Sequence, residues 1–364
     1  MVSTIISRIV EAGFPAGARV VESAIELPLN ERFWLISNTQ GPRWLIPHDY
    51  SYGFHAFLQW RPYGLLSHIK WKVLCRIYRA GQLGRLPEVN YVGIAGCSQN
   101  QWSHLGWCED VHPVPVVYIG TPGATQKAVI SLVNSYTRKV VSIAKIPLGR
   151  EASTNIFHEY GALSKLSTTK PGVAPRPYYM NYDLGSSSQE ALRGRLVGRK
   201  YLHEYDAYLN SLQTASEVSV YEKSQVLIEK ILRIDNGSSN IKESLFDVLS
   251  RLRDKTVLPA YYVHGDFVPW NIFKTECGHI VATDWEMADL EGLPLYDYFY
   301  YHYQQNYLFK QSAINIAPNG LLIKDISKQL IGEIKKYTLA SMAMQSLLAG
   351  NNASYFLKEI DSSV

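Results

Sequence analysis

Hydrophobic and polar positions are arranged differently in successive stretches of this chain. Residues 32–37 and 43–47 are short aromatic-rich runs on either side of a turn-rich segment, so they predict a hairpin. Residues 52–79 carry apolar side chains at three-to-four spacing among five cations and no acidic residue. This pattern predicts an amphipathic helical region with a basic face, which we interpret as solvated rather than as an anion-binding patch.

A different pattern begins near residue 114. Three β-type runs separated by turn residues predict an antiparallel meander: residues 114–119, 127–133 and 139–146. A helix is expected at residues 153–166, and another β-type run at 189–196. The triple serine at residues 186–188 is interpreted as a loop. From residue 199 helical patterns dominate, interrupted at residues 260–284 by apolar strands that carry polar residues.

Residues 261–286 hold polar side chains at spacings that have a chemical rationale. His264, Asp266 and Asn271 form an H-x-D-x4-N sequence, and Asp284 follows the next β-type run. Phosphoryl transfer needs a carboxylate near the acceptor hydroxyl and oxygen ligands that hold Mg²⁺ against the nucleotide phosphates. Asp266 supplies the first of these groups, and Asn271 and Asp284 supply the second.

Asn271 and Asp284 are distant in sequence, but a hairpin can bring them together. Residues 271–273 and 280–282 are β-type runs that flank a turn at residues 275–278, so they predict pairing across that turn. The alternative is that these polar residues only decorate a turn between two strands. Three matches in order, with a hairpin of suitable length between them, favour the functional interpretation.

The sequence HGDFVPWNI, followed by ATDWE, resembles the catalytic loop and metal-binding segment of the aminoglycoside phosphotransferase and choline kinase group, relatives of protein kinases. The resemblance extends less distinctly over residues 114–301. It implies that Asp266 is the catalytic base, that Asn271 and Asp284 bind Mg²⁺, and that His264 organises the loop. It also implies a structural role for Asp297, in the segment after the metal site.

The resemblance implies an α+β, bilobal protein-kinase-like fold with an extra N-terminal α+β region. Residues 114–196 would form an antiparallel-sheet N-lobe with a hinge, and residues 197–364 a mainly helical C-lobe with the catalytic loop. ATP or GTP would bind between the lobes. Residues 1–113 fall outside the resemblance and are expected to form an N-terminal extension whose role is not readable.

A kinase of this type also needs a strand lysine for the α and β phosphates and a helix carboxylate that holds the lysine. Lys145 ends a β-type run, and Glu159 lies fourteen residues later in a predicted helix. They are the expected ion pair, with Glu151 as the rival partner. Exposed, unpaired side chains are the alternative for both, and the downstream motif makes it the weaker one.

Two further nucleotide-binding segments are expected from their positions. Gly120 and Gly123 lie in a turn before Lys145, where backbone N–H groups could cover phosphates, although the turn lacks the full GxGxxG pattern. Taken alone it is an ordinary hairpin turn. The segment from Gln189 to Leu192 resembles the family's hinge, where backbone groups would pair with a purine.

Composition excludes some classes of protein. The 364 residues include 36 basic and 32 acidic side chains, a formal charge of +4 that demands neither nucleic acid nor a membrane surface. The four cysteines form no CxxC pair, and no segment is long and apolar enough to span a bilayer, so we expect a cytoplasmic protein. Four residues form a C-x6-H-x3-C-x3-H run whose first spacing is unusual for a zinc finger, so we disfavour a zinc site there: Cys97, His104, Cys108 and His112.

The expected activity is therefore an ATP- or GTP-dependent, Mg²⁺-dependent transfer of phosphate to a hydroxyl of a small molecule. A sugar or related metabolite is the favoured acceptor, because the C-terminal region lacks the acidic run that a polycationic aminoglycoside would need. Choline-type amino alcohols are the competing acceptors, with residues 296–303 as a source of aromatic rings. A pseudokinase that binds or scaffolds without turnover is the alternative of another class. The sequence does not indicate an oligomeric state.

Overall fold

The computed structural model describes residues 2–21, 26–58, 62, 64–97, 102–107, 111–234, 239–309, 318 and 326–362. The chain divides into two compact units, Met1–Arg195 and Leu196–Val364, and each is described by itself. Within the described residues, no helix has the length and apolar character needed to cross a membrane.

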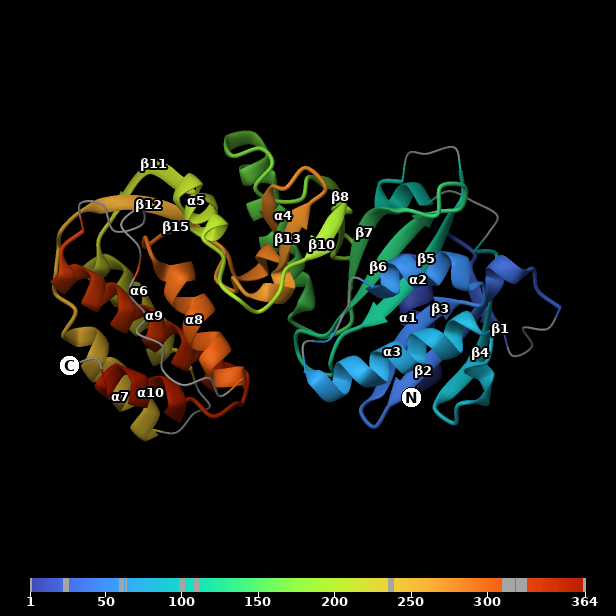
Figure 1. Cartoon of the computed structure of the whole chain (residues 1–364). Helices are drawn as coiled ribbons and strands as arrows, with labels where there is room; N and C mark the ends of the chain where they lie inside the picture. The colour runs from blue at the N-terminus through green and yellow to red at the C-terminus, as the bar shows by residue number, and fades with distance from the viewer. Residues whose placement is uncertain are drawn as a thin grey trace. The chain divides into compact units, whose positions relative to one another are not determined.

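The first unit is built on one sheet in which every neighbouring pair of strands is antiparallel (Figure 1). The strand order is β1-β4-β2-β3-β5-β6-β7-β9-β8. The predicted hairpin and the predicted meander are both confirmed within it. Its strands have these bounds: β1 Arg19–Val21, β2 Arg32–Asn38, β3 Gly41–Pro47, β4 Val89–Ala95, β5 Pro113–Ile119, β6 Lys127–Asn134, β7 Val140–Pro147, β8 Pro177–Asn181 and β9 Ser186–Glu190.

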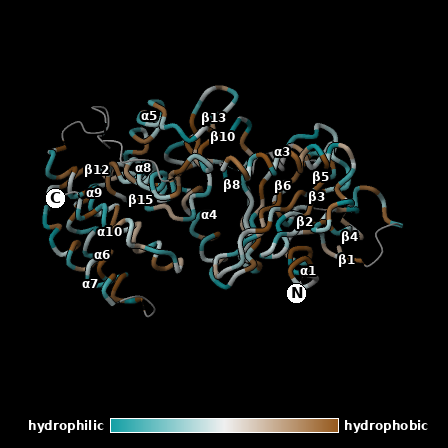
Figure 2. Tube along the Cα trace, turned by 60° about the horizontal axis from the view of Figure 1, so that its bottom comes forward, coloured by the Kyte–Doolittle hydropathy of each residue, from teal (hydrophilic) through white to brown (hydrophobic). Residues whose placement is uncertain are grey.

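Helices cover both faces of this sheet, because alternate residues of a strand point to opposite sides. Phe33 and Leu35 of β2 pack in one apolar cluster with residues of helix α1 (Val2–Gly13). Ile36 of the same strand packs in a second cluster with residues of α2 (Tyr50–Leu58) and α3 (Leu65–Arg79). Figure 2 shows the apolar colouring of α1. A fourth helix, α4 (Ala152–Thr169), contacts β7, β8 and β9 and confirms the helix predicted there.

The first 113 residues continue the sheet of the following segment. Strand β3 pairs with β5 through Trp44 opposite Tyr118 and Leu45 opposite Val117. The expected boundary between residues 113 and 114 therefore lies inside a single sheet. Strand β5 is buried along almost its whole length, which is the pattern of a central strand with neighbours on both edges.

The interpretation of residues 186–188 as a loop was wrong. The three serines begin strand β9, which lies between β7 and β8, and all three are buried. Serine has a loop-like preference in sequence, but here the backbone hydrogen bonds on both edges of β9 outweigh it. The small side chains allow the strand to pack under α4.

The second unit is mainly helical, with two small sheets. Its helices are α5 Glu204–Ser211, α6 Val220–Leu232, α7 Ser239–Ser250, α8 Tyr296–Phe309, α9 Lys328–Leu348 and α10 Ser354–Asp361. One sheet has the order β11-β12-β15, with bounds Gln213–Val218, Leu258–Val263 and Asp289–Gly292. The other has the order β10-β13-β14, with bounds Gly194–Leu196, Ile272–Thr275 and Ile280–Ala282. The mixed α+β class with antiparallel sheets is thus confirmed.

Candidate active site

The H-x-D-x4-N sequence forms a loop between β12 and β13. Strand β12 ends at Val263, and a short 3-10 turn, Pro269–Asn271, leads into β13. Gly265 has a φ of +80°, and a Cβ atom at this position would collide with the carbonyl oxygen of Met287. Glycine is therefore required here, because any side chain would be both strained and blocked.

Two neutral donors hold the carboxylate of Asp266. Tyr300 Oη donates to Oδ1 at 3.0 Å, and Asn271 Nδ2 donates to Oδ2 at 2.9 Å. The same Nδ2 atom also donates to the Asp266 carbonyl oxygen at 3.0 Å. Both carboxylate oxygens are thus fixed in direction, one by a residue of the loop and one by a residue of α8.

Burial and a neighbouring negative charge bring the pKa of Asp266 toward neutral pH. Burial raises the pKa of Asp266 to about 6, and the negative charge of Asp284 adds to the rise, while the donors Tyr300 and Asn271 oppose it. Burial and the Asp266 charge raise the pKa of Tyr300 well above its usual value, so Tyr300 stays protonated and donates. A carboxylate whose pKa lies close to the working pH is suited to general-base catalysis.

The predicted hairpin brings Asn271 next to the strand end that carries Asp284. Strands β13 and β14 pair with Ile272 opposite Ala282, and Thr283 N donates to the Asn271 carbonyl oxygen at 2.8 Å. Asp284 follows directly and has a left-handed backbone, with a φ of 67°. Such a conformation is uncommon outside glycine, although aspartate and asparagine adopt it more readily than other residues, and it is found preferentially at functional sites.

The donor set of this hairpin fits Mg²⁺. The amide nitrogen of Asn271 is turned toward Asp266, which leaves the amide oxygen on the opposite side for a cation. Asp284 adds a carboxylate. Mg²⁺ is commonly bound by one or two protein oxygen ligands, with waters and phosphate oxygens completing the shell, so two ligands are sufficient.

The C-x6-H-x3-C-x3-H run lies only partly within the described residues. Within the described residues, no group of three or more His, Cys, Asp or Glu side chains is arranged to hold a metal. Burial raises the pKa of the Cys97 thiol to about 12, and the Cys97 Sγ atom lies 3.6 Å from the Asn30 carbonyl oxygen. Cys108 lies outside the described residues.

His264 holds the loop from inside. The ring is fully buried, its Nδ1 accepts from Asp266 N at 3.2 Å, and its Nε2 lies 2.8 Å from the Thr283 carbonyl oxygen. A carbonyl can only accept, so Nε2 carries the proton and the ring is neutral. The ring also packs on Trp285, with centroids 4.7 Å apart. The contacts of His264 thus tie the loop to the end of β14.

Helix α8 holds the same loop from a second side. The buried carboxylate of Asp297 accepts the backbone N–H groups of His264 at 2.7 Å and Gly265 at 3.0 Å. Burial raises the pKa of Asp297 to about 7, against the effect of these donors. The structural role expected for Asp297 is consistent with both hydrogen bonds.

Tyr300 is the main residue of this site that sequence reasoning missed. It lies three positions after Asp297 on α8, so both side chains project from the same face of the helix. That spacing was the available signal, because Asp297 had already been assigned to the loop. Nothing in a tyrosine-rich segment marks one tyrosine as the partner of Asp266 rather than as a core residue.

In the first unit, the ion pair of Lys145 with Glu159 is present. Lys145 Nζ lies 2.6 and 2.5 Å from the two Glu159 oxygens, and both side chains are buried. Lys145 lies in β7 between β6 and β9, and Glu159 interrupts the apolar stripe of α4. The rival partner, Glu151, instead lies 3.2 Å from Arg150 on the surface. A role of the pair in nucleotide binding stays a prediction.

The glycine-containing turn between β5 and β6 is closed by its own backbone. Gly120 N donates to the Lys127 carbonyl oxygen at 2.9 Å, and Gln126 N donates to the Gly123 carbonyl oxygen at 3.2 Å. Gly149, which sequence reasoning missed, packs so closely on the turn that a Cβ atom there would collide with the Ala124 carbonyl oxygen. The turn is therefore anchored to the end of β7, and its contact with phosphates stays a prediction.

The predicted hinge begins in β9 and continues past its end. Gln189 pairs with Ile143 of β7, and its carbonyl oxygen accepts from Ser142 Oγ at 3.3 Å. Leu192 follows the end of β9 and is partly buried. Neither contact tests purine binding, so the hinge assignment also stays a prediction.

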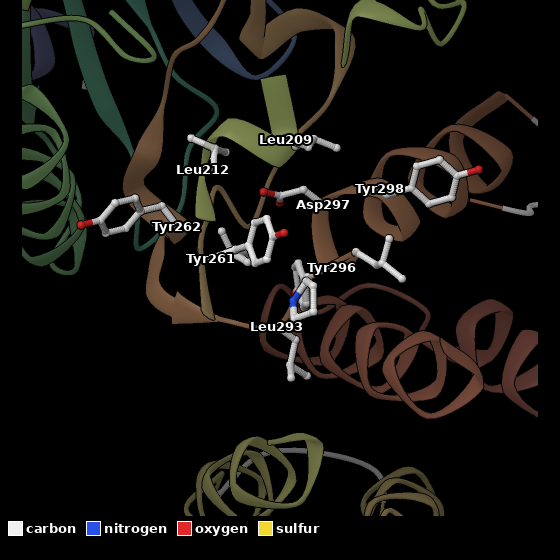
Figure 3. A pocket seen from close by; sticks show the side chains of 11 residues that line it. Leu209, Leu212, Tyr261, Tyr262, Leu293, Tyr296, Asp297 and Tyr298 are labelled. Carbon is white, nitrogen blue, oxygen red and sulfur yellow. The ribbon is translucent and has the colours of Figure 1, made fainter. Parts of the chain in front are cut away.

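A small pocket in the second unit is lined by Asp297 and by the strand that precedes the catalytic loop (Figure 3). Its lining comes from β12, from the end of α5 and from residues 293–298, and it includes Asp297 but neither Asp266 nor Asn271. The space open to a water molecule is about 20 Å³, which suits a water or two and not a metabolite. We assign no substrate to this pocket.

Comparison with known proteins gives similarity in structure only. No family model matches the chain, and no curated protein matches it. Among solved structures, choline kinase LicA from Streptococcus pneumoniae is 14% identical over 71% of this chain and 90% of its own, with a TM-score of 0.43. A thermostable mutant of aminoglycoside phosphotransferase APH(4)-Ia, in a ternary complex with ADP and hygromycin B, is 14% identical over 68% of this chain and 92% of its own, with a TM-score of 0.44. Similar structures thus include members of the group that the motif resembles, but at this similarity they indicate no substrate for this chain.

Proposed function

We propose that this chain is a Mg²⁺-dependent phosphotransferase that moves the γ-phosphate of ATP or GTP to a hydroxyl of a small molecule. The observation that carries the proposal is the Asp266 carboxylate, fixed by Tyr300 and Asn271 beside the hairpin that ends at Asp284. This combination of a proton acceptor with two metal-ligand side chains serves phosphoryl transfer to an alcohol.

In the proposed reaction, Asp266 orients the acceptor hydroxyl and receives its proton. The acceptor oxygen forms a bond to the γ-phosphorus, and the bond from that phosphorus to its bridging oxygen breaks, so a nucleoside diphosphate leaves. Asn271 and Asp284 would hold Mg²⁺, which supplies positive charge against the phosphate oxygens. Positioning and charge neutralisation supply most of the catalysis in this class of reaction.

Lys145 would contact the α and β phosphates. The buried pairing with Glu159 at 2.5 Å supports this role, because it fixes the direction of an otherwise flexible side chain. Gly120 and Gly123 would cover the phosphates, and the backbone of residues 189–192 would meet the purine. A choice between ATP and GTP does not follow from these residues.

A neutral, polyhydroxylated metabolite such as a sugar is the acceptor class that we favour. A choline-type acceptor would need an open cage of aromatic rings, but the rings of residues 296–303 are buried in the second unit. Their hydroxyl groups bond within the protein: Tyr296 Oη lies 2.9 Å from Ser341 Oγ, and Tyr301 Oη donates to the Arg199 carbonyl oxygen. Within residues 296–303 these rings serve packing, so they offer no open cage for a quaternary amine. We place the enzyme in the cytoplasm, where nucleoside triphosphates are available.

A phosphate-transfer screen tests the proposal. Terminally labelled ATP and GTP are offered with Mg²⁺ and a panel of sugars, amino alcohols and aminoglycosides, using the full chain and its Asp266→Asn variant. We expect label transfer that requires both Mg²⁺ and Asp266. Asp247→Asn is the matched control, because Asp247 is exposed on α7 and pairs only with Arg251 in the described structure. Transfer that survives in Asp266→Asn contradicts the proposal.

Nucleotide binding separates an enzyme from a binding module that lacks turnover. We expect nucleotide with Mg²⁺ to raise the melting temperature more than nucleotide alone, and slow hydrolysis to occur without an acceptor. Stabilisation without any hydrolysis or transfer would instead favour the pseudokinase alternative.

A further inference from the structure

Helix α3 of the first unit has a buried face that fixes its orientation. Cys75 and Tyr78 are buried in the second apolar cluster of the sheet, and Trp71 and Leu74 pack against that cluster. Tyr78 Oη also donates to the Pro47 carbonyl oxygen at 2.7 Å. The helix therefore cannot rotate about its axis without losing these contacts, and its outer face is determined. Figure 1 shows α3 lying along one side of the sheet.

The outer face of α3 carries an apolar stripe. Four hydrophobic side chains are exposed there: Leu65 by 77%, Leu66 by 76%, Ile69 by 51% and Val73 by 48%. At about 100° per residue they fall within a single arc of about 100°. The exposed side of a surface helix is normally polar, so a contiguous stripe on the face opposite the core indicates an interaction surface.

Cations border this stripe on both sides. Lys70 lies along one edge, and Lys72, Arg76 and Arg79 lie along the other edge and the C-terminal end, and all four are exposed. The helix contains no acidic residue. The interpretation of this basic face as merely solvated does not account for the apolar stripe beside the cations. An exposed apolar centre with a uniformly basic border is the chemistry that matches an anionic lipid surface.

We propose that α3 seats the first unit on the surface of an anionic lipid bilayer. The leucine, isoleucine and valine side chains enter the boundary between headgroups and acyl chains, while the lysines and arginines meet the acidic headgroups. A second copy of this chain fits less well, because a two-fold contact through the stripe would place the same four cations against each other. The proposal concerns attachment to a surface and does not depend on the phosphotransferase activity.

Vesicle co-sedimentation of the full chain tests the proposal. The probes are vesicles of phosphatidylcholine alone and of phosphatidylcholine mixed with an equal part of phosphatidylglycerol. We expect binding to the mixed vesicles only, and we expect added salt to weaken it. Leu66→Asp with Ile69→Asp removes the stripe and should abolish sedimentation. Lys70→Glu with Lys72→Glu should reduce the partition coefficient by about tenfold or more.

Helix α6 supplies the matched controls, because it also exposes hydrophobic and basic side chains. Val226→Asp with Leu232→Asp replaces two side chains that are 49% and 70% exposed, and Lys230→Glu with Arg233→Glu reverses two exposed charges. Both control variants should bind vesicles like the unaltered chain. Melting temperatures establish that every variant is folded.

Three results would overturn the proposal. The unaltered chain could fail to sediment with the mixed vesicles, or the α3 variants could sediment as well as the controls do. Light scattering could also show that the unaltered chain is a dimer, that the stripe variant is a monomer and that neither binds vesicles. In that last case the stripe is a contact between two copies of the chain.

Discussion

Two carboxylates, one in each unit, are kept in place in opposite ways. Glu159 of the first unit is fully buried, and its charge is neutralised by Lys145 at 2.5 Å. Asp266 of the second unit is held by neutral donors, Tyr300 and Asn271, and the nearby charge of Asp284 has the same sign as its own.

Under the proposed function, this difference separates a group that sets geometry from a group that performs chemistry. The two charges of the Lys145–Glu159 pair balance each other without a ligand. Glu159 can therefore fix the direction of Lys145 before a nucleotide binds. Two like charges close together are unfavourable until a cation or a proton joins them. The like charges of Asp266 and Asp284 therefore make this hairpin the place where we expect Mg²⁺.

Replacing Asp284 should have the largest effect, because it removes one of the two like charges in the second unit. Asp284→Asn should lower phosphate transfer by about 10⁴-fold, because a metal ligand is lost. The same change should leave the protein without Mg²⁺ equally stable or more stable by up to about 1 kcal/mol, because repulsion of Asp266 is removed. Asparagine tolerates the left-handed backbone at this position. Transfer assays and urea unfolding measure the two effects.

Asp247→Asn controls for the loss of an aspartate that lies elsewhere in the unit. This exposed residue should leave activity unchanged and alter stability by less than about 0.5 kcal/mol. A clear loss of stability in Asp284→Asn would show that Asp284 is a structural residue and that its charge is already compensated.

Removing one member of the buried ion pair tests whether Glu159 and Lys145 depend on each other for stability in the first unit. Lys145→Met and Glu159→Gln should each cost about 3–5 kcal/mol of stability, because each leaves a buried group without its partner. Lys145→Met combined with Glu159→Leu should recover much of that loss, since neither charge remains. Urea unfolding of the singles and the double gives the coupling energy.

A second lysine–glutamate pair provides the matched control. Lys274 and Glu204 lie 2.8 Å apart, but their side chains are 29% and 52% exposed. Breaking this pair with Lys274→Met should cost less than about 1 kcal/mol. Equal losses for the two pairs would contradict the claim that burial gives the first pair its importance.

Local pattern was sufficient for the parts of the site that depend on short-range geometry. The hairpin that brings Asn271 beside Thr283 follows from two β-type runs and a turn, and the structure confirms their pairing. The ion pair of Lys145 with Glu159 was predicted in a different way, because spacing alone left Glu151 as a rival partner and the downstream kinase-like motif supplied the reason to expect a pair. In both cases the partners lie within a single strand-turn-strand or strand-loop-helix unit, so a local pattern was enough to name the candidates.

Contacts between segments that are distant in sequence could not be predicted from the local pattern. Tyr300 reaches Asp266 from a helix 34 residues away in sequence, and its buried position depends on how α8 packs. Residues 186–188 read as a loop by composition, yet strand pairing on both edges makes them part of the sheet. Likewise, the pairing of β3 with β5 joins segments that the sequence pattern separates near residue 113.

His302 extends the comparison to a third buried group, which avoids the cost of burial by losing its charge. Burial lowers the pKa of His302 to about 4, although Asp206 opposes the shift, and the ring packs against Tyr201, Tyr298 and Tyr301. The unfolded chain binds the proton near the usual pKa of 6.5, so between pH 6.5 and 4 it holds more protons than the folded chain. The contribution of His302 to stability should therefore fall by about 2 kcal/mol from pH 7 to pH 5. The raised pKa values of Asp266 and Asp297 contribute in the opposite direction, so a variant is needed to isolate the histidine.

The His302→Phe variant keeps a ring in the cluster and removes the titration. On going from pH 7 to pH 5, the free energy of unfolding of this variant should change by about 2 kcal/mol in its favour relative to that of the unaltered chain. His279→Phe is the control, because His279 is exposed in the turn after β13. An identical pH dependence for all three proteins would mean that His302 is not neutral in the folded chain. Urea unfolding at the two pH values measures the difference.

Replacing Tyr300 should have the smallest effect, and it tests directly whether a neutral donor holds Asp266 in place. Tyr300→Phe keeps the ring packed and removes one neutral donor from Asp266, whereas Glu159 would keep its charged partner throughout. We expect kcat to fall by about tenfold, as the loss of one hydrogen bond to a charged group suggests. The KM for the nucleotide should not change, because the Asp266 carboxylate, and not a phosphate group, loses the contact.

Tyr303→Phe on the same helix is the control, since Tyr303 makes no described contact with Asp266. If Tyr300→Phe leaves kcat intact but lowers the melting temperature, Tyr300 serves packing alone, and the orientation of Asp266 depends on Asn271.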